Sequence, residues 1–179
     1  MVESGYSGPR RSFVQRMIAA AMLDVSVYEE VEADRTATGQ AAGVVVLAAV
    51  AAAIGSFGDD HAIGGLVGAL IGWAAWAGVT FLIGSTAFKG TATWGELLRT
   101  LGFAQAPGLL YIVGIIPLLG GLAKLIISIW ILIAGIIAIR QALDISTGKA
   151  VAVAILGWLA LMIVMAMFAG TALLTLFAR

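Results

Sequence analysis

Only a few side chains in this sequence have types and spacing that could support chemistry, and the most compact group is Asp59, Asp60 and His61. Carboxylate and imidazole groups together could bind a divalent cation. Three consecutive side chains on a loop point in different directions, however, and no second cluster can complete a coordination shell. His61 is also the single histidine of the chain, which excludes a multi-histidine metal site. We therefore expect a solvated loop here and no bound metal.

A second candidate is the stretch 146–149 (STGK), which looks like the end of a phosphate-binding loop. Leu143 stands where the first glycine of such a loop belongs, and Ala150 stands where a Ser or Thr is needed. We interpret Ser146 instead as the N-cap of the helix that follows. The chain has no cysteine, and its apolar segments hold no paired acids or His–Glu motif. The sequence therefore predicts neither an enzyme nor a cofactor.

Composition indicates the class of protein. Hydrophobic residues make up 61% of the chain and charged residues 11%, whereas a soluble domain has about 25% charged and about 45–50% apolar residues. The net charge is zero, so no basic surface field would attract nucleic acid. The chain is expected to lie in a lipid bilayer.

Five apolar segments come close to the length of about 20 residues that a membrane-spanning helix needs. They cover about residues 40–57, 62–88, 101–119, 122–140 and 150–177. A short helix over residues 94–100 precedes the third, and Thr93 with Glu96 forms a capping box at its start. Backbone groups in lipid must be hydrogen-bonded within the protein, and these runs lack the alternation of barrel strands. We predict an all-α integral membrane protein, with residues 1–38 as a tail and residues 39–179 as a five-span domain.

Within the tail, residues 12–28 show the apolar periodicity of an amphipathic helix, with Ser12 and Gln15 as a capping box. Arg16 falls on its polar side, whereas Asp24 lies at the edge of the apolar stripe and does not fit the pattern. The helix is too polar to span a bilayer, so it either lies in the interface or packs under the bundle. Residues 28–35 follow as an acidic connector.

The distribution of Lys and Arg predicts the orientation. If the N-terminus is cytoplasmic, the tail and the second and fourth loops carry eight of the ten basic residues, as cytoplasmic segments usually do. We therefore expect a multi-pass protein of the cell membrane with a cytoplasmic N-terminus and an outside C-terminus. Lys124 would then extend to the outer interface.

Two features of the spans concern packing. Gly64, Gly68 and Gly72 repeat every fourth residue, which lets helix backbones approach closely. We expect this stripe to pack within the bundle, with homodimerisation as the alternative. Gln105 and Pro107 lie early in the third span, where a proline bends a helix. The bend is interpreted as a structural kink, with a transport-path hinge as the alternative.

Charged residues are also predicted to gather at the cytoplasmic level. They would form an ionic collar that ties the N-terminal segment to the bundle, or a surface for a partner. The residues concerned are Tyr28, Glu29, Glu30, Asp34, Arg99, Arg140, Asp144 and Lys149.

Several stretches of the chain resemble one known family. These are residues 28–41 (YEEVEADRTATGQA), 101–110 (LGFAQAPGLL), 117–122 (PLLGGL) and 129–156 (IWILIAGIIAIRQALDISTGKAVAVAIL). Together they are similar to the Yip domain family, the Ypt-interacting proteins, in its short prokaryotic form. The resemblance implies five spans, a cytoplasmic N-terminus and no catalytic activity. Eukaryotic relatives are linked to Rab-type GTPases through long N-terminal regions. The short one here gives us no reason to expect a GTPase partner.

These observations predict a membrane protein that acts by protein–protein interaction, as an adaptor, an assembly factor or an accessory subunit. Its expected partners are the lipid bilayer and another membrane protein or a second copy of itself. A transporter of small solutes or lipids is the alternative, motivated by the bend at Gln105 and Pro107.

Overall fold

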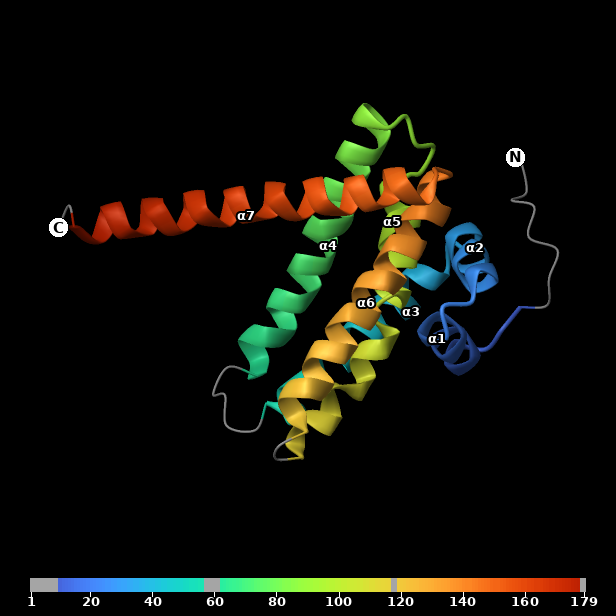
Figure 1. Ribbon diagram of the computed structural model, residues 1–179, viewed down its shortest axis with the longest axis horizontal. Helices are drawn as coiled ribbons and strands as arrows, with labels where there is room; N and C mark the ends of the chain where they lie inside the picture. Colours follow the sequence, from blue (N-terminus) through green and yellow to red (C-terminus); the bar gives the residue numbers. More distant parts are fainter. Residues whose placement is uncertain (1–9, 57–61, 117–118, 178–179) are drawn as a thin grey trace.

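The computed structural model describes residues 10–56, 62–116 and 119–177, and this part of the chain is helical without strands (Figure 1). The elements are α1 (Phe13–Ala21), α2 (Val25–Ala33), α3 (Ala37–Gly55), α4 (Ala62–Ala87), α5 (Trp94–Phe103), the 3-10 helix η1 (Ala106–Ile115), α6 (Gly120–Leu143) and α7 (Thr147–Phe177). Asp59, Asp60 and His61, the cation candidate of the sequence, lie outside the described residues.

Within the described residues, five segments are long and apolar enough to cross a membrane, which confirms the predicted fold class. They are Ala37–Gly55, Gly65–Ala87, Trp94–Ile115, Gly120–Leu143 and Thr147–Val164. The third begins earlier than the sequence suggested, because α5 and η1 together form one crossing. The capping boxes of Ser12 with Gln15 and of Thr93 with Glu96 are both present, so the local start signals were interpreted correctly.

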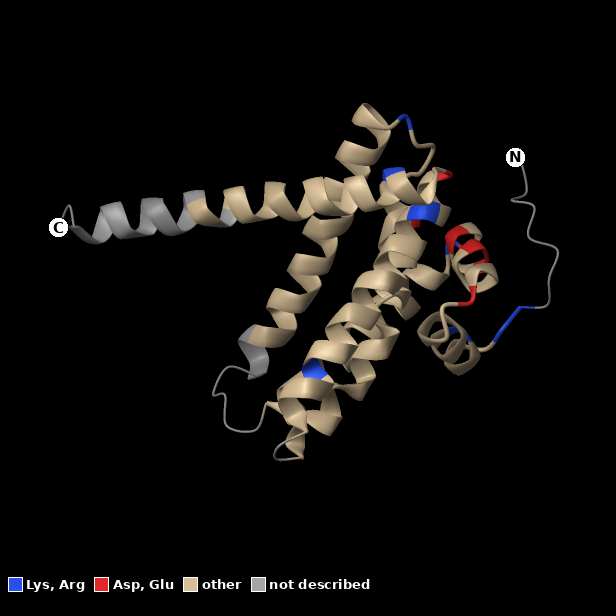
Figure 2. Cartoon of the chain, viewed as in Figure 1, with Lys and Arg blue, Asp and Glu red and all other residues tan. Residues whose placement is uncertain are grey.

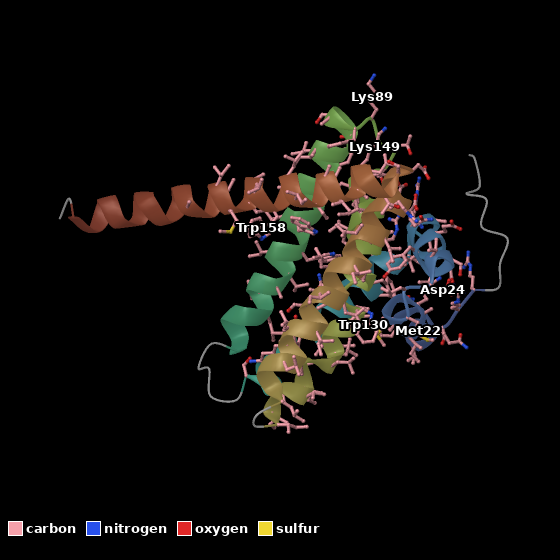
Figure 3. The ribbon with its side chains drawn as sticks, in the orientation of Figure 1. Met22, Asp24, Lys89, Trp130, Lys149 and Trp158 are labelled. Carbon is pink, nitrogen blue, oxygen red and sulfur yellow. The ribbon has the colours of Figure 1, made fainter. Side chains whose placement is uncertain are left out.

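The spans form a bundle in which α3 packs against α5 and η1, and α6 also packs against η1. α4 contacts α3, α5 and α7. α7 crosses α4 and α6 and then continues away from the bundle (Figure 1). We call the end where α4 and α6 finish and α5 and α7 begin the polar end, since Lys89, Asp144 and Lys149 lie there (Figures 2 and 3).

A seam of small residues joins α3 to α5 and η1. A Cβ atom added to Gly102 would lie 2.7 Å from the Cβ atom of Ala41, and one added to Gly114 would lie 2.6 Å from the carbonyl oxygen of Gly55. Gly108 likewise faces Ala48. From Gly108 to Gly114 is two turns of a 3-10 helix at about 3.0 residues per turn. The 3-10 geometry therefore keeps both glycines on the face that meets α3.

The predicted stripe on α4 behaves differently. No heavy atom of another part of the described chain comes within 4 Å of a Cβ atom placed at Gly68 or Gly72. The expectation that these glycines pack within the bundle is therefore wrong, because their side of α4 faces outward. The surroundings of Gly64 lie outside what the structure describes, and homodimerisation through this face stays a prediction.

The N-terminal segment is a hairpin of two helices, not the single helix expected over residues 12–28. The chain reverses at Leu23, whose φ of 62° is left-handed. Asp24 then caps α2, since its side chain accepts a hydrogen bond of 3.0 Å from the backbone N–H of Ser26. This role explains why Asp24 did not fit the apolar stripe. The supposed acidic connector is thus mostly helical, because α2 runs to Ala33.

Candidate functional site

A buried ion-pair cluster lies between α1 and α2. Both Arg16 and Glu30 are only 2% exposed. The Arg16 guanidinium lies 2.9 Å from Glu30 Oε1 and 2.8 Å from Asp34 Oδ2, and its Nη1 donates to Gln40 Oε1 at 3.0 Å. Arg16 was predicted on the polar side of the helix, away from the apolar stripe, but its side chain is buried. It follows Phe13 by three residues and precedes Ala20 by four, so it shares their buried face.

Arg11 completes this cluster from the segment before α1. Its backbone N–H donates to Glu30 Oε1 at 2.9 Å, and its guanidinium lies 3.2 Å from Glu30 Oε2 and 3.0 Å from Asp24 Oδ2. Buried charges are tolerated only when their hydrogen bonds are well satisfied. Two arginines thus hold three carboxylates, and the cluster closes the hairpin.

The charges of the cluster reinforce one another electrostatically. Burial alone would lower the pKa of Arg16, but its hydrogen bonds to Asp34 and Glu30 outweigh burial and raise that pKa. Burial would raise the pKa of Asp34, but hydrogen bonds from Thr36 and Arg16 outweigh it and lower that pKa. The charged forms are therefore the favoured ones.

Arg99 fastens α2 to the bundle. The side chain comes from α5 and is 6% exposed. Its Nε donates to the backbone carbonyl oxygens of Val31 at 2.9 Å and Glu32 at 3.1 Å. The last carbonyls of a helix lack partners within the helix and carry partial negative charge. A cation at this position therefore both satisfies them and fixes α2 against α5.

Carbonyl oxygens at the end of α1 also accept hydrogen bonds from side chains, and here the donors are uncharged. Tyr28 on α2 is fully buried and donates its hydroxyl to the carbonyl of Ala20 at 3.1 Å, and burial raises the pKa of this phenol. Trp130, in the middle of α6, donates its indole N–H to the carbonyl of Ala21 at 2.7 Å. α1 therefore packs against the side of the bundle, beside the middle of a span (Figure 3).

An ionic collar was predicted in which Arg99, Arg140 and Lys149 would supply the cations for the acids of the N-terminal segment. The structure pairs these acids with other cations. Within the described residues, neither Arg140 nor Lys149 forms an ion pair with the acids of the hairpin. Arg140 donates to the side chain of Gln141, which in turn donates to Glu29 at 2.9 Å. Asp144 accepts from Thr91 at 2.9 Å, and Lys149 is exposed. The cations that pair with Glu30 and Asp34 are Arg11 and Arg16 of the hairpin itself, and the sequence pattern did not predict these pairs.

Glu32 lies on α2 at the polar end, near other carboxylates. Burial, followed by the nearby carboxylates of Glu96 and Asp144, raises the pKa of Glu32 to about 7. Arg99 opposes this shift, and Glu29 adds to it. The group lies where α2 packs on α5 and α6, so its charge affects how tightly α2 is held.

The bend predicted at Gln105 and Pro107 is a change of helix type. α5 ends at Phe103, and η1 begins at Ala106 with the buried Pro107 in its first turn. Proline is tolerated there because the first N–H groups of a helix have no intrahelical partner. Gln105 is half-buried at this junction.

The described residues hold no group of three or more His, Asp or Glu side chains that could bind a metal ion. A family model described as the Yip1 domain matches residues 17–169, which is most of the chain. Neither a comparison with curated proteins nor one with solved structures found a match. The family match covers part of the hairpin, the first four spans and most of α7. The chain therefore belongs to the Yip1 domain family.

Proposed function

We propose that this Yip1-family protein works without catalysis, by binding another membrane protein at its polar end. It would serve as an adaptor, an assembly factor or an accessory subunit of a larger complex. The observation that supports this most is the attachment of α2 to α5 through Arg99 and the closed ion-pair cluster behind it. A surface that is already ordered loses less conformational entropy when a partner binds.

The polar side chains at this end come from several elements. Glu29 on α2, Lys89 after α4, Asp144 at the end of α6 and Lys149 on α7 are all exposed. Figure 2 shows charged residues gathered over this end and over the hairpin. Lys124 lies near the start of α6 and therefore toward the opposite end. Exposed charges of both signs suit recognition by electrostatic complementarity.

Co-purification after gentle solubilisation tests the proposal. The wild-type chain should bring down a specific membrane protein, and the charge reversals Lys89→Glu and Lys149→Glu should weaken that association. Gly121→Lys adds a charge at the opposite end, where a side chain meets no neighbour within 4 Å, and should leave it unchanged. A partner-free monomer at native expression would count against the proposal.

We also propose that the polar end is cytoplasmic and that the protein resides in the cell membrane. The positive-inside rule supports this orientation. The chain has no cysteine, so single cysteines report topology without background. In intact cells a membrane-impermeant maleimide should label Gly121→Cys and leave Ser146→Cys unlabelled. The reverse pattern would show that the orientation is inverted.

The position of the hairpin supports contact between α1 and the membrane lipid. Val14, Ile18 and Met22 follow one another at four-residue spacing and are 55%, 55% and 74% exposed. Trp130 holds the end of this helix beside the middle of α6. We therefore place the apolar stripe of α1 in the acyl chains of the cytoplasmic leaflet, with the ion pairs shielded behind it.

A second candidate function is the movement of a small solute or lipid. The interruption of the third span between Phe103 and Ala106, with a half-buried Gln105 inside it, favours this candidate. Purified protein in vesicles should then raise solute flux or lipid scrambling above empty vesicles. Rates equal to those of empty vesicles would remove the candidate.

A further inference from the structure

A groove of about 710 Å³ lies between α4, α5, α6 and α7. Its floor includes Leu101 and Ala104, which are 2% and 1% exposed. Its rim includes Leu132, Ile155 and Trp158, which are all more than half exposed. The groove therefore has a closed floor and an open mouth, and Figure 3 shows Trp158 on α7 near its crossing with α4.

The lining of this groove carries no ionisable side chain, and its polar side chains beside two tryptophans are Gln105 and Ser128. Ser128 already donates to the carbonyl of Lys124 at 2.8 Å and lies 2.9 Å from the hydroxyl of Tyr111. By contrast, no hydrogen bond joins the Gln105 side chain to any other described residue. An amide without a partner in an apolar setting is unfavourable. The groove therefore offers a donor and an acceptor to a neutral ligand.

The position of the groove limits what can occupy it. All of its walls belong to membrane-spanning segments, so its mouth opens to lipid. The volume lies within the range of about 300–1,000 Å³ typical of ligand pockets. We propose that the groove binds a neutral lipid. Its apolar chain lies along α6 and α7, and its carbonyl or hydroxyl group bonds to the Gln105 amide. This inference does not depend on the partner proposed for the polar end.

Photolabelling of the full chain in phosphatidylcholine nanodiscs tests this site, with a diacylglycerol that carries a diazirine in one acyl chain as the probe. Label should concentrate on peptides from residues 131–139 and 151–158. Gly135 lines the groove and has open space around its Cβ position, so Gly135→Leu should fill the site and abolish most labelling. Gly72→Leu adds the same side chain in open space on α4 and should leave labelling unchanged.

A second variant tests the polar contact. Gln105→Leu should weaken labelling about fivefold, the loss expected for one hydrogen bond. Unlabelled diacylglycerol should compete with the probe better than phosphatidylglycerol does. Even labelling around the bundle, unchanged by Gly135→Leu, would overturn the proposal. So would a photo-crosslinking residue at position 135 that captures a second copy of the chain, since the groove would then be a helix interface.

Discussion

At the scale of single residues, buried arginines organise the N-terminal hairpin. Arg16 has ionic partners on α2 and just beyond its end, and Arg99 binds the carbonyls at the end of that helix. The arginine fork suits these contacts because it donates to several acceptors in one plane. The hairpin thus depends on a few charged contacts as much as on apolar packing.

Substitution of Arg16 by Ala should release the hairpin while the spans stay folded. It leaves Glu30 buried with only Arg11 for a partner, and the loss of one member of a buried ion pair costs about 3–5 kcal/mol. Hydrogen exchange of the amides of α1 and α2 should become faster, with α6 unchanged. Arg10→Ala removes an exposed arginine and serves as the matched control. Equal protection in both variants would contradict the role of Arg16.

Because the pKa of Glu32 is raised, we expect the stability of the α2 attachment to depend on pH. That pKa is raised to about 7 in the folded protein, so the folded state binds a proton that the unfolded state has released. Stability of the attachment should therefore fall as pH rises from about 5 to about 7.5, and then level off. The pKa values of Asp24 and Asp34 are lowered, so these groups stay ionised over that range.

Hydrogen exchange of α2, corrected for the intrinsic effect of pH, measures this dependence. Glu32→Gln should flatten it. Glu29→Gln changes an exposed carboxylate on the same helix that contributes least to the pKa shift of Glu32, and it should largely preserve the dependence. A wild-type attachment that is equally stable at pH 5.5 and pH 7.5 would show that Glu32 does not titrate there.

At the scale of elements, contact with α3 explains why the second half of the third span is a 3-10 helix. η1 is 10 residues long, although 3-10 helices usually run to only three or four residues. The seam that places Gly108 against Ala48 and Gly114 against Gly55 gives a physical reason for this length. Close backbone approach through small residues is a common way to pack membrane helices.

Gly114→Ala should destabilise the bundle, because its Cβ atom would lie 2.6 Å from the carbonyl oxygen of Gly55. Gly72→Ala meets nothing within 4 Å and removes a flexible residue from a helix, so it should be neutral or stabilising by up to about 1 kcal/mol. Thermal unfolding in detergent compares the two. A Gly114→Ala variant as stable as wild type would show that the seam tolerates a methyl group.

Sequence patterns predicted the spans and both capping boxes because those signals are local: apolar length in one case, and a Ser or Thr three residues before Gln or Glu in the other. The reversal at Leu23 gave no such signal, since apolar periodicity runs through it. The glycine seam was missed for a different reason. Which glycines pack depends on which helices are neighbours, so Gly68 and Gly114 cannot be distinguished from spacing alone.

At the scale of the whole molecule, the two ends of the bundle differ. The polar end carries most of the described charges and the fastened helix α2, whereas the opposite end is mainly apolar (Figure 2). α1 lies against the flank, and α7 leaves the bundle after crossing α4 and α6 (Figure 1). This asymmetry is the reason why we propose the polar end as the surface that binds a partner.

Site-specific photo-crosslinking in native membranes tests this account most directly. A photo-reactive amino acid at position 29, exposed on α2, should capture one specific membrane protein. The same residue at position 72, on the outward side of α4, should not capture that protein. Arg16→Ala, which releases the hairpin, should reduce the capture at position 29. Capture of no protein at position 29, or of the same protein equally well at both positions, would contradict a partner surface at the polar end.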